Sequence, residues 1–405
     1  MSEANPIPSR REFWAVVTLI AGTCGYFLIF AQFAFWELLR AHVGADQLQV
    51  SMIALGLAGV AGSGLAAWRF RLVTCQTALR GGAMACVLAA VAGCVDASPV
   101  AAAAVGLSVG WLTVTLVAGL RAAAGMQHLG RAVGVGTGLA YAACNLPGVH
   151  SAAPLVQAGM AIVLMAVAAV AIRWVRMGEA EVSHNDDFRP VRMAAWVGIF
   201  LALVWMESAA FYVIQHTPVL RAETWGGSLR LLLNATIHLA VAVGAGVWMD
   251  RGRFGRVVLA GWAALAGSCL LLDERMRPFV GVEVLYTAGV SACAVALVYY
   301  AARGGRAWLV AVLLTIAGGL GSALGIGMAQ ELNRLPVGFV LAACAVVTGL
   351  LTIRHRGRRL RRPLLLAVAG LLWVPAQREA RAGAVADLPV VNATLAAHPM
   401  NSRSS

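Results

Sequence analysis

The chain has 405 residues, of which 60% are hydrophobic and only 12% are charged, and its mean hydropathy is +0.79. A soluble domain carries roughly twice that charged fraction, so the composition excludes an ordinary soluble protein. The formal net charge of +13 comes entirely from arginine, since no lysine occurs. Most of these arginines fall on one predicted side of a membrane, so their number does not indicate nucleic-acid binding.

Unbroken apolar runs of roughly 18 to 24 residues recur along the chain, about the length an α-helix needs to cross a bilayer. Strands of a membrane barrel would instead alternate in hydrophobicity over short segments. We therefore predict an all-α integral membrane protein. Its twelve predicted crossings are 13–37, 47–67, 77–95, 99–120, 131–148, 153–172, 193–215, 229–248, 257–272, 279–300, 307–329 and 336–353. Four prolines lie at or near crossing starts, where a missing N–H is harmless: Pro99, Pro154, Pro278 and Pro336.

Arginine is unevenly distributed between the predicted loops. With the N-terminus placed in the cytoplasm, inner segments carry 21 arginines and outer loops carry 6. Such a bias sets the orientation of a membrane protein. We expect a multi-pass protein of a bacterial-type inner membrane with a cytoplasmic N-terminus.

The chain repeats itself at an offset of 182 residues. This offset superposes Gly62 on Gly244, Gly64 on Gly246, Arg69 on Arg251, Arg71 on Arg253, Arg121 on Arg303, Gly136 on Gly318, Pro154 on Pro336 and Arg176 on Arg358. A period of this length in apolar helices indicates a duplicated bundle whose halves are related by an axis along the membrane normal. We expect an N-terminal six-helix half at 1–175, a cytoplasmic linker at 176–192 and a C-terminal six-helix half at 193–354.

The remaining residues, 355–405, combine a basic segment, a short apolar segment and a polar tail. The apolar run 363–374 reaches only about 18 Å as a helix, short of a comfortable crossing. Three alternatives stay open: a short thirteenth crossing with the tail on the periplasmic side, an interfacial segment, and a disordered end. The tail has too little apolar material to form a core.

One predicted inner loop carries a recognisable motif. Gly246, Asp250 and Arg251 match the pattern Gly-x-x-x-Asp-Arg-x-Gly-Arg, after which Gly-Arg at 252–253 arrives one residue early. The earlier copy of the loop has Trp68 where the aspartate should stand. Together with the twelve-crossing duplicated layout, this motif resembles the major facilitator superfamily of transporters over the whole body to about residue 353.

The resemblance implies that the two halves rock against each other and open a shared cavity to each face in turn. It also implies that the motif residues latch the inner side of this cavity. The alternative for them is a solvated inner turn. The gate candidates are Asp250, Arg251, Arg253, Arg69 and Arg71.

The most informative ionisable residue is Glu207, which lies about 14 residues from the inner end of the seventh crossing, or about 21 Å deep. The eighth crossing carries Asn234 and His238 one helical turn apart on one face, at a similar depth. A Glu–Asn–His cluster near the middle of the membrane is therefore geometrically possible. Such a carboxylate can bind and release a proton as its cavity alternates, and the alternative is a polar group that fixes helix packing.

Five more polar residues are candidates for binding a substrate or a proton. For Gln32, Tyr141 and Asn145 the alternative is helix packing, and for Glu283 it is contact with the outer headgroups. They are Gln32 in the first crossing, Tyr141 and Asn145 in the fifth, and Glu283 and Tyr286 in the tenth.

Glycine pairs four residues apart indicate close helix packing. One pair is Gly130 and Gly134, and the other is Gly321 and Gly325. The spacing carries no information about a ligand.

No cofactor and no metal site is indicated. The eight cysteines form neither a Cys-x-x-Cys pair nor a haem-attachment motif. His238 is followed at the fourth position by Ala242, and Met160 and Met165 are five residues apart, so copper-binding spacing is not met. No plausible nucleophile group arises at membrane depth, so we do not expect an enzyme.

The leading hypothesis is a proton-coupled secondary active transporter that moves a small solute by alternating access. The few intramembrane charges favour a neutral or amphipathic solute. The expected partners are the lipid bilayer, the solute and the proton, without nucleic acid. The alternative is a non-transporting membrane subunit, anchor or assembly factor of a respiratory or redox complex, which would bind a membrane protein complex.

Overall fold

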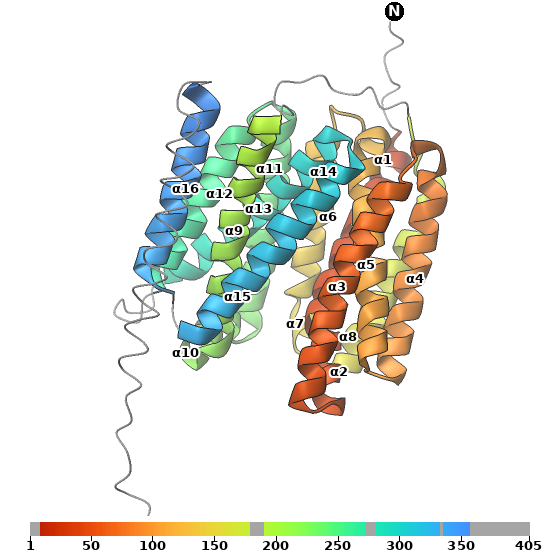
Figure 1. Ribbon diagram of the computed structural model, residues 1–405, viewed down its shortest axis with the longest axis horizontal. Coiled ribbons are helices and arrows are strands. Elements are labelled where there is room, and N and C mark those ends of the chain that lie inside the picture. The colour runs from red at the N-terminus through yellow and green to blue at the C-terminus, as the bar shows by residue number, and fades with distance from the viewer. Residues whose placement is uncertain (1–8, 179–189, 273–279, 333–334, 357–405) are drawn as a thin grey trace, which may run out of the picture.

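The computed structural model describes residues 9–178, 190–272, 280–332 and 335–356. Within these residues the regular structure is helical, and the chain forms two bundles of long helices that stand side by side (Figure 1). The predicted crossings therefore have the secondary structure that their apolar length requires. The apolar run 363–374 and most of the predicted linker lie outside the described residues.

The first bundle holds the first half of the chain. Its first membrane-length helix is continuous through a π-helical middle. The elements are α1 (Arg10–Gly25), η1 (Tyr26–Ala34), α2 (Phe35–His42), α3 (Ala45–Arg69), η2 (Leu72–Thr74), α4 (Cys75–Val95), α5 (Pro99–Ala124), α6 (Leu129–Cys144), α7 (Pro147–His150), α8 (Pro154–Ala171) and η3 (Ile172–Trp174).

The second bundle holds the second half. A second π-helical segment, η5, lies within the helix of the eleventh predicted crossing. The elements are α9 (Pro190–His216), α10 (Pro218–Trp225), α11 (Ser228–Asp250), α12 (Phe254–Leu271), α13 (Val280–Gly304), α14 (Ala307–Val312), η5 (Leu313–Leu320), α15 (Gly321–Leu332) and α16 (Val337–Arg356).

Ten helices in the described part of the chain are long and apolar enough to cross a membrane. The fifth and twelfth predicted crossings are also helices, but their apolar stretches are shorter. α6 has 16 residues, about 24 Å, and the apolar part of α16 is 337–351. The predicted fifth crossing ran to residue 148, whereas α6 ends at Cys144. The reason is Pro147, which disfavours a helical conformation at the preceding residue and starts α7.

Prolines mark helix starts, as predicted. Pro99 and Pro154 occupy the first turns of α5 and α8, where their missing N–H groups cost nothing. Ser98 adds a side-chain cap by accepting a hydrogen bond from the Ala101 amide. Pro278 lies outside the described residues.

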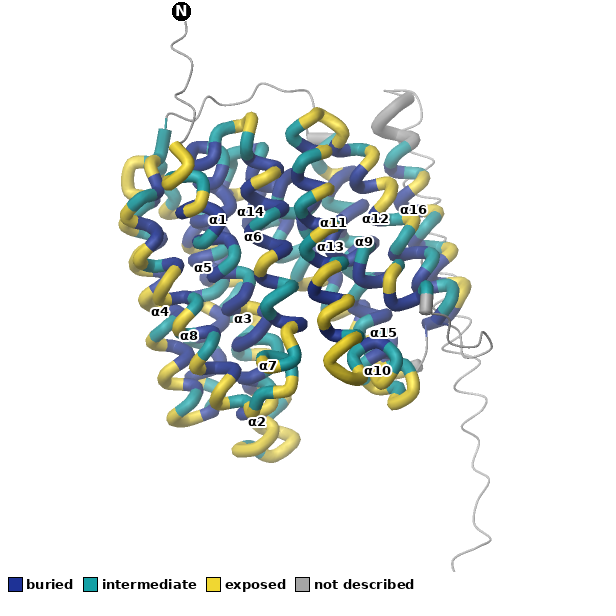
Figure 2. The backbone as a smooth tube through the Cα atoms, turned by 180° about the vertical axis from the view of Figure 1, so that it is seen from behind, coloured by how far each residue is buried: buried dark blue, intermediate teal, exposed yellow. Residues whose placement is uncertain are grey.

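Burial follows the position of each helix in the bundle rather than its polarity. Residues on the surfaces between helices are buried, whereas buried and exposed residues alternate along the helices of the perimeter (Figure 2). Many of these exposed residues are large and apolar, such as Leu57 at 66% and Leu88 at 65%. A perimeter of this kind suits lipid, because hydrocarbon is as apolar as leucine.

The two bundles meet where α6 runs against α11. Gly130 and Gly134 of α6 lie against the α11 backbone, and a Cβ placed on Gly134 would come within 3.1 Å of the Gly246 Cα. In the reverse direction, a Cβ on Gly246 would lie 3.2 Å from the Gly134 Cα. The packing predicted from the first glycine pair is confirmed, because the backbones meet without intervening side chains.

The second glycine pair also permits a close contact, within the second bundle. A Cβ on Gly321 would meet the Leu201 carbonyl at 3.2 Å, and one on Gly325 would meet the Ala209 amide nitrogen at 3.0 Å. Both belong to α15 and face α9, so this prediction is confirmed as well.

Gly246 and its repeat counterpart Gly64 provide a matched test of the contact between the bundles. An added methyl at Gly246 has no space, whereas none of the atoms around Gly64 lies within 4 Å of such a group. We expect Gly246→Ala to lower the free energy of unfolding by about 1–3 kcal/mol through overpacking. Gly64→Ala should leave it unchanged or raise it slightly, since alanine favours helix. Unfolding midpoints of the purified proteins in detergent measure the difference, and equal midpoints would contradict the packing.

Candidate functional site

Glu207 of α9 faces the interface between the bundles. It is half-buried and, among the described residues, forms neither a hydrogen bond nor an ion pair. Its charge acts on the hydroxyls of Tyr141 from α6 and Tyr286 from α13. Because Tyr141 belongs to the first bundle, Glu207 lies near the surface that the two bundles share. An ionisable group within a membrane-spanning helix costs free energy when no partner compensates its charge.

Tyr141 and His238 connect the two bundles beside this carboxylate. Their rings stack, with centroids 4.7 Å apart and planes inclined by 21°. His238 Nδ1 lies 2.7 Å from the hydroxyl of Ser291, which donates its own hydrogen to the Thr287 carbonyl at 2.9 Å. Since the serine has only one hydrogen, the network assigns the proton of His238 to Nδ1. A neutral imidazole then presents Nε2 as an acceptor.

Asn234 has its hydrogen-bonding groups occupied by the protein. Its Nδ2 donates to the Thr224 carbonyl at 2.7 Å, and its Oδ1 accepts from Thr287 Oγ1 at 3.0 Å. Asn234 and His238 thus both contact α13, through Thr287 and Ser291, one turn apart. Among the described residues no hydrogen bond joins either of them to Glu207. The proposed Glu–Asn–His cluster stays a prediction.

The other candidates lie around this interface or at the ends of its helices. Glu283 is only 6% exposed, its Oε1 has no hydrogen-bond partner among the described residues, and the charge of Arg230 acts on it. Asn145 donates to the Tyr141 carbonyl at 2.9 Å and so caps the end of α6. Gln32 is half-buried in η1, without a hydrogen bond to another described residue. Their roles in binding stay predictions.

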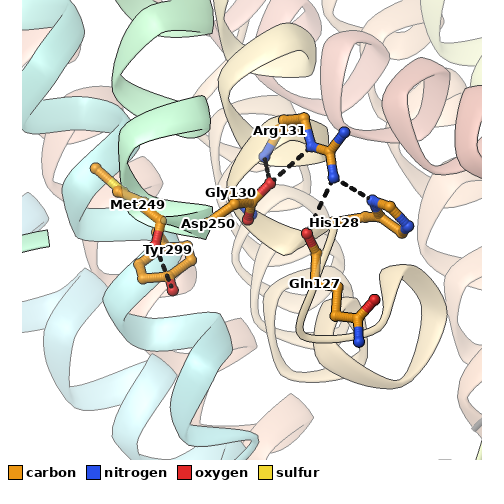
Figure 3. A network of polar contacts seen from close by, with 7 residues as sticks. All are labelled: Gln127, His128, Gly130, Arg131, Met249, Asp250 and Tyr299. Carbon is orange, nitrogen blue, oxygen red and sulfur yellow. Dashed lines mark hydrogen bonds and ion pairs between the residues drawn. The ribbon is translucent and has the colours of Figure 1, made fainter. Parts of the chain in front are cut away.

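At the other end of the α6–α11 contact, Asp250 closes the interface (Figure 3). Its Oδ1 accepts from the Gly130 amide at 2.6 Å, and its Oδ2 accepts from the Arg131 amide and from Arg131 Nε, each at 3.0 Å. The carboxylate side chain is 8% exposed and the arginine 45%. The two amides are the first free donors of α6, so the acid caps the positive end of this helix across the interface.

A histidine extends this network toward the first helix. Arg131 Nη2 donates to His128 Nδ1 at 2.6 Å and to the Gln127 carbonyl at 3.2 Å. The His128 ring in turn lies edge-on to Phe13 of α1, with centroids 6.4 Å apart. A second link between the bundles lies at the same end, where Arg121 Nη1 donates to the Arg303 carbonyl at 3.4 Å.

Among the described residues, none of the remaining gate candidates forms a hydrogen bond or an ion pair with the Asp250 side chain. Arg251 and Arg253 follow it on an exposed turn, and among the described residues neither forms an ion pair. Arg69 stacks over the ring of Trp68 at 4.8 Å, and Arg71 is exposed. The partner of the motif aspartate is therefore Arg131, and the roles of these four arginines in gating stay predictions.

Four aromatic rings connect the bundles at the opposite end, and the sequence analysis did not identify them. Phe33 of η1 lies 6.3 Å from Phe211 of α9, and His150 of α7 lies 6.5 Å from Phe33 and 6.4 Å from Trp225 of α10. Phe211 and Trp225 are 5.6 Å apart. We call these four residues the outer aromatic cluster. Aromatic side chains near helix ends usually mark the bilayer interface, so their position in the chain did not distinguish them.

No protein-family model matches the sequence, and no curated protein matches it either. Solved structures do match the fold. The crystal structure of the human organic anion transporter MFSD10 (TETRAN) aligns at a TM-score of 0.57 and 15% identity, over 90% of this chain and 99% of that one. The structure of the major facilitator superfamily proton:xylose symporter XylE, bound to 6-bromo-6-deoxy-D-glucose, aligns at 0.62 and 12% identity, over 85% and 95%. The chain has the major facilitator superfamily fold.

This fold was the one expected from the loop motif and the duplicated layout, and that prediction is confirmed. At these identities the likeness concerns the fold, not the ligand. The protein is therefore a multi-pass helical membrane protein of the superfamily architecture. The interface that carries Glu207, Tyr141 and His238 is the one between the two bundles of that architecture.

The Asp250 cap can be tested against a surface ion pair. Asp250→Ala leaves two amides and a guanidinium without their acceptor, and we expect it to lower the free energy of unfolding by about 1–3 kcal/mol. Glu37→Ala breaks the exposed Glu37–Arg40 pair, in which N and O are 3.5 Å apart, and should cost less than about 1 kcal/mol. Unfolding midpoints in detergent compare the two, and an equal or smaller loss for Asp250→Ala would contradict the cap.

His150 predicts a pH dependence. Burial, and then the charge of Arg221, hold the pKa of His150 below its ordinary value of 6.5. The unfolded chain therefore binds a proton more readily than the folded chain, so this residue's contribution to stability declines as the pH falls below 6.5. We expect the stability difference between wild type and His150→Phe, which keeps a ring, to shift in favour of the variant between pH 7.5 and 5. A difference that is constant with pH would contradict this prediction.

Proposed function

We propose that this protein is a secondary transporter in which Glu207 couples solute movement to protons. The observation that carries the proposal is the half-buried Glu207 carboxylate, which lies between the bundles without a hydrogen bond or ion pair to another described residue. A charge in this position costs free energy unless a ligand or a proton compensates it. The two solved structures named above are of transporters, and the fold provides two bundles that can move against each other.

Contacts at both ends of the interface support alternating access. The Asp250–Arg131 pair and the Arg121–Arg303 contact hold the bundles together at one end. The outer aromatic cluster links them at the other end through ring contacts longer than 5.5 Å. Directional hydrogen bonds at one end and adaptable ring contacts at the other are the kinds of contact that a rocking motion breaks and remakes in turn.

The groups near Glu207 favour a small neutral or amphipathic solute. Tyr141 and Tyr286 offer ring faces and hydroxyls, and His238 offers one acceptor nitrogen. An apolar lining with a few polar groups suits recognition of this kind. The alternative, a non-transporting subunit, is not favoured by either matching structure.

Proteoliposomes with a trapped pH indicator test the proposal. A panel of small neutral and amphipathic solutes is added under an imposed pH gradient, and both solute uptake and internal pH are recorded. We expect wild type to couple the two fluxes. Glu207→Gln should abolish the solute-dependent proton flux, because the amide cannot carry a proton, while solute exchange at equal pH persists.

Glu37→Gln is the matched control, since it removes an exposed carboxylate that is paired with Arg40. It should leave both fluxes unchanged. Unaltered proton coupling in Glu207→Gln would rule out this residue as the coupling group. A wild type that moves no solute of the panel, with or without a gradient, would count against transport itself.

A further inference from the structure

A groove lies between α1 and α8 at the arginine-rich end of the first bundle. Its volume is about 640 Å³, and the residues lining it include Trp14, Val163, Val167 and Trp174. Trp14 is 47% exposed, Val163 61% and Val167 51%, so the groove opens on the perimeter of the bundle. In a membrane-spanning protein this surface faces lipid.

The body of the groove is apolar and its end is cationic. Apart from Arg11 and Thr18, alanine, valine and tryptophan line it. Arg11 lies at the start of α1, and its guanidinium carbon is 4.5 Å from the centre of the Trp174 ring. The groove therefore runs from an apolar stretch to one cation and two indole rings. This order matches one bilayer leaflet from hydrocarbon to headgroup.

Within the part of the chain that the structure describes, no carboxylate balances the charges of Arg11 and Arg173. Arg173 stacks on the same Trp174 ring at 3.9 Å, and among the described residues neither it nor Arg11 meets a carboxylate. The nearby Glu12 is occupied by Arg176, with Nε and Oε1 3.1 Å apart, and by the Ser9 amide. Two guanidinium groups on one indole repel each other, and an anion beside them would relieve that repulsion.

We propose that this groove binds an anionic phospholipid of the adjacent leaflet. The acyl chain lies along Val163 and Val167, and the phosphate lies at Arg11. Arg173, which stacks on the Trp174 ring but does not line the groove, adds positive charge nearby. A free anion would use the arginines but leave the apolar groove empty, and a neutral lipid would fill the groove but leave the charges unbalanced. Basic sites between membrane helices suit anionic headgroups in this way.

The groove shares its first helix with the network that closes the interface. Trp14 in the groove is edge-on to Phe13, with centroids 5.7 Å apart, and Phe13 contacts His128, which accepts from Arg131. The bound lipid therefore lies against the first turn of α1, whose Phe13 contacts the Asp250 network through His128. The site itself does not depend on the proposed function.

Native mass spectrometry of the purified full chain tests the site. The protein in detergent is offered dioleoylphosphatidylglycerol, dioleoylphosphatidylcholine or inorganic phosphate, and the fraction that retains one bound molecule is measured. We expect wild type to retain the glycerol lipid about fivefold or more over the choline lipid, a preference that Arg11→Gln reduces by about fivefold. Val167→Trp, which fills the groove, should abolish retention of both lipids.

Controls come from the other bundle at the same membrane end. Arg256→Gln removes an equal charge at the start of α12, and Leu259→Trp enlarges a perimeter residue that is 48% exposed. Neither should alter retention. Arg256 is exposed like Arg11, and Leu259 is about as exposed as Val167. A general loss of folding or of surface charge would therefore affect the controls equally.

Several outcomes would overturn the proposal. Equal retention of both lipids would assign the groove to neutral lipid. Displacement of phosphatidylglycerol by millimolar phosphate would assign the arginines to a free anion. A dimer peak lost in Val167→Trp would assign the groove to a second copy of the chain, and an effect of Arg256→Gln equal to that of Arg11→Gln would remove its specificity.

Discussion

The two halves of this protein meet as bare backbone, and the rest of the interface depends on that contact. Gly130 and Gly134 allow α6 to touch α11 at Gly246, so no side chain separates the two helices. Dispersion forces act at full strength at such a distance, and in a membrane they replace the hydrophobic effect. Asp250 adds directional hydrogen bonds to the free amides of α6 and fixes the register of the contact.

The same contact continues into the middle of the membrane. Along α6 it passes from Gly134 through Gly138 to Tyr141, and along α11 it ends with His238 stacked on that tyrosine. Tyr141 thus lies on the same helix-to-helix contact as the Asp250–Arg131 ion pair, several turns away.

The duplicated halves do not contribute equally to the interface. The later copy of the loop motif has Asp250 and a tightly packed Gly246, whereas the earlier copy has Trp68 and a Gly64 without neighbours within 4 Å. The two sides of a duplicated bundle would be equivalent if both copies were kept. In this protein the α6–α11 side carries the Asp250 hydrogen bonds and ion pair, so the two copies of the loop contribute different contacts.

Most of the architecture followed from the sequence, because crossing length is a local property. The second crossing was predicted at 47–67, and α3 runs over Ala45–Arg69. Contacts between distant residues were not predictable in the same way. Asp250 was identified by its motif, but its partner Arg131 is 119 residues away and has no local signal. The outer aromatic cluster was missed for a similar reason, since four ordinary aromatic residues converge from four separate elements.

The π-helical segment η1 changes the direction of the side chains that follow it in the first membrane-length helix, Arg10–His42. A π-helix bonds each amide one residue further back than an α-helix does, so η1 holds more residues per turn without breaking the helix. The side chains beyond it, such as Leu38 and Leu39, point in directions that a 3.6-residue wheel drawn from Arg10 would misassign. A gapless alignment of this helix with an uninterrupted α-helix therefore pairs the wrong faces over its final turns.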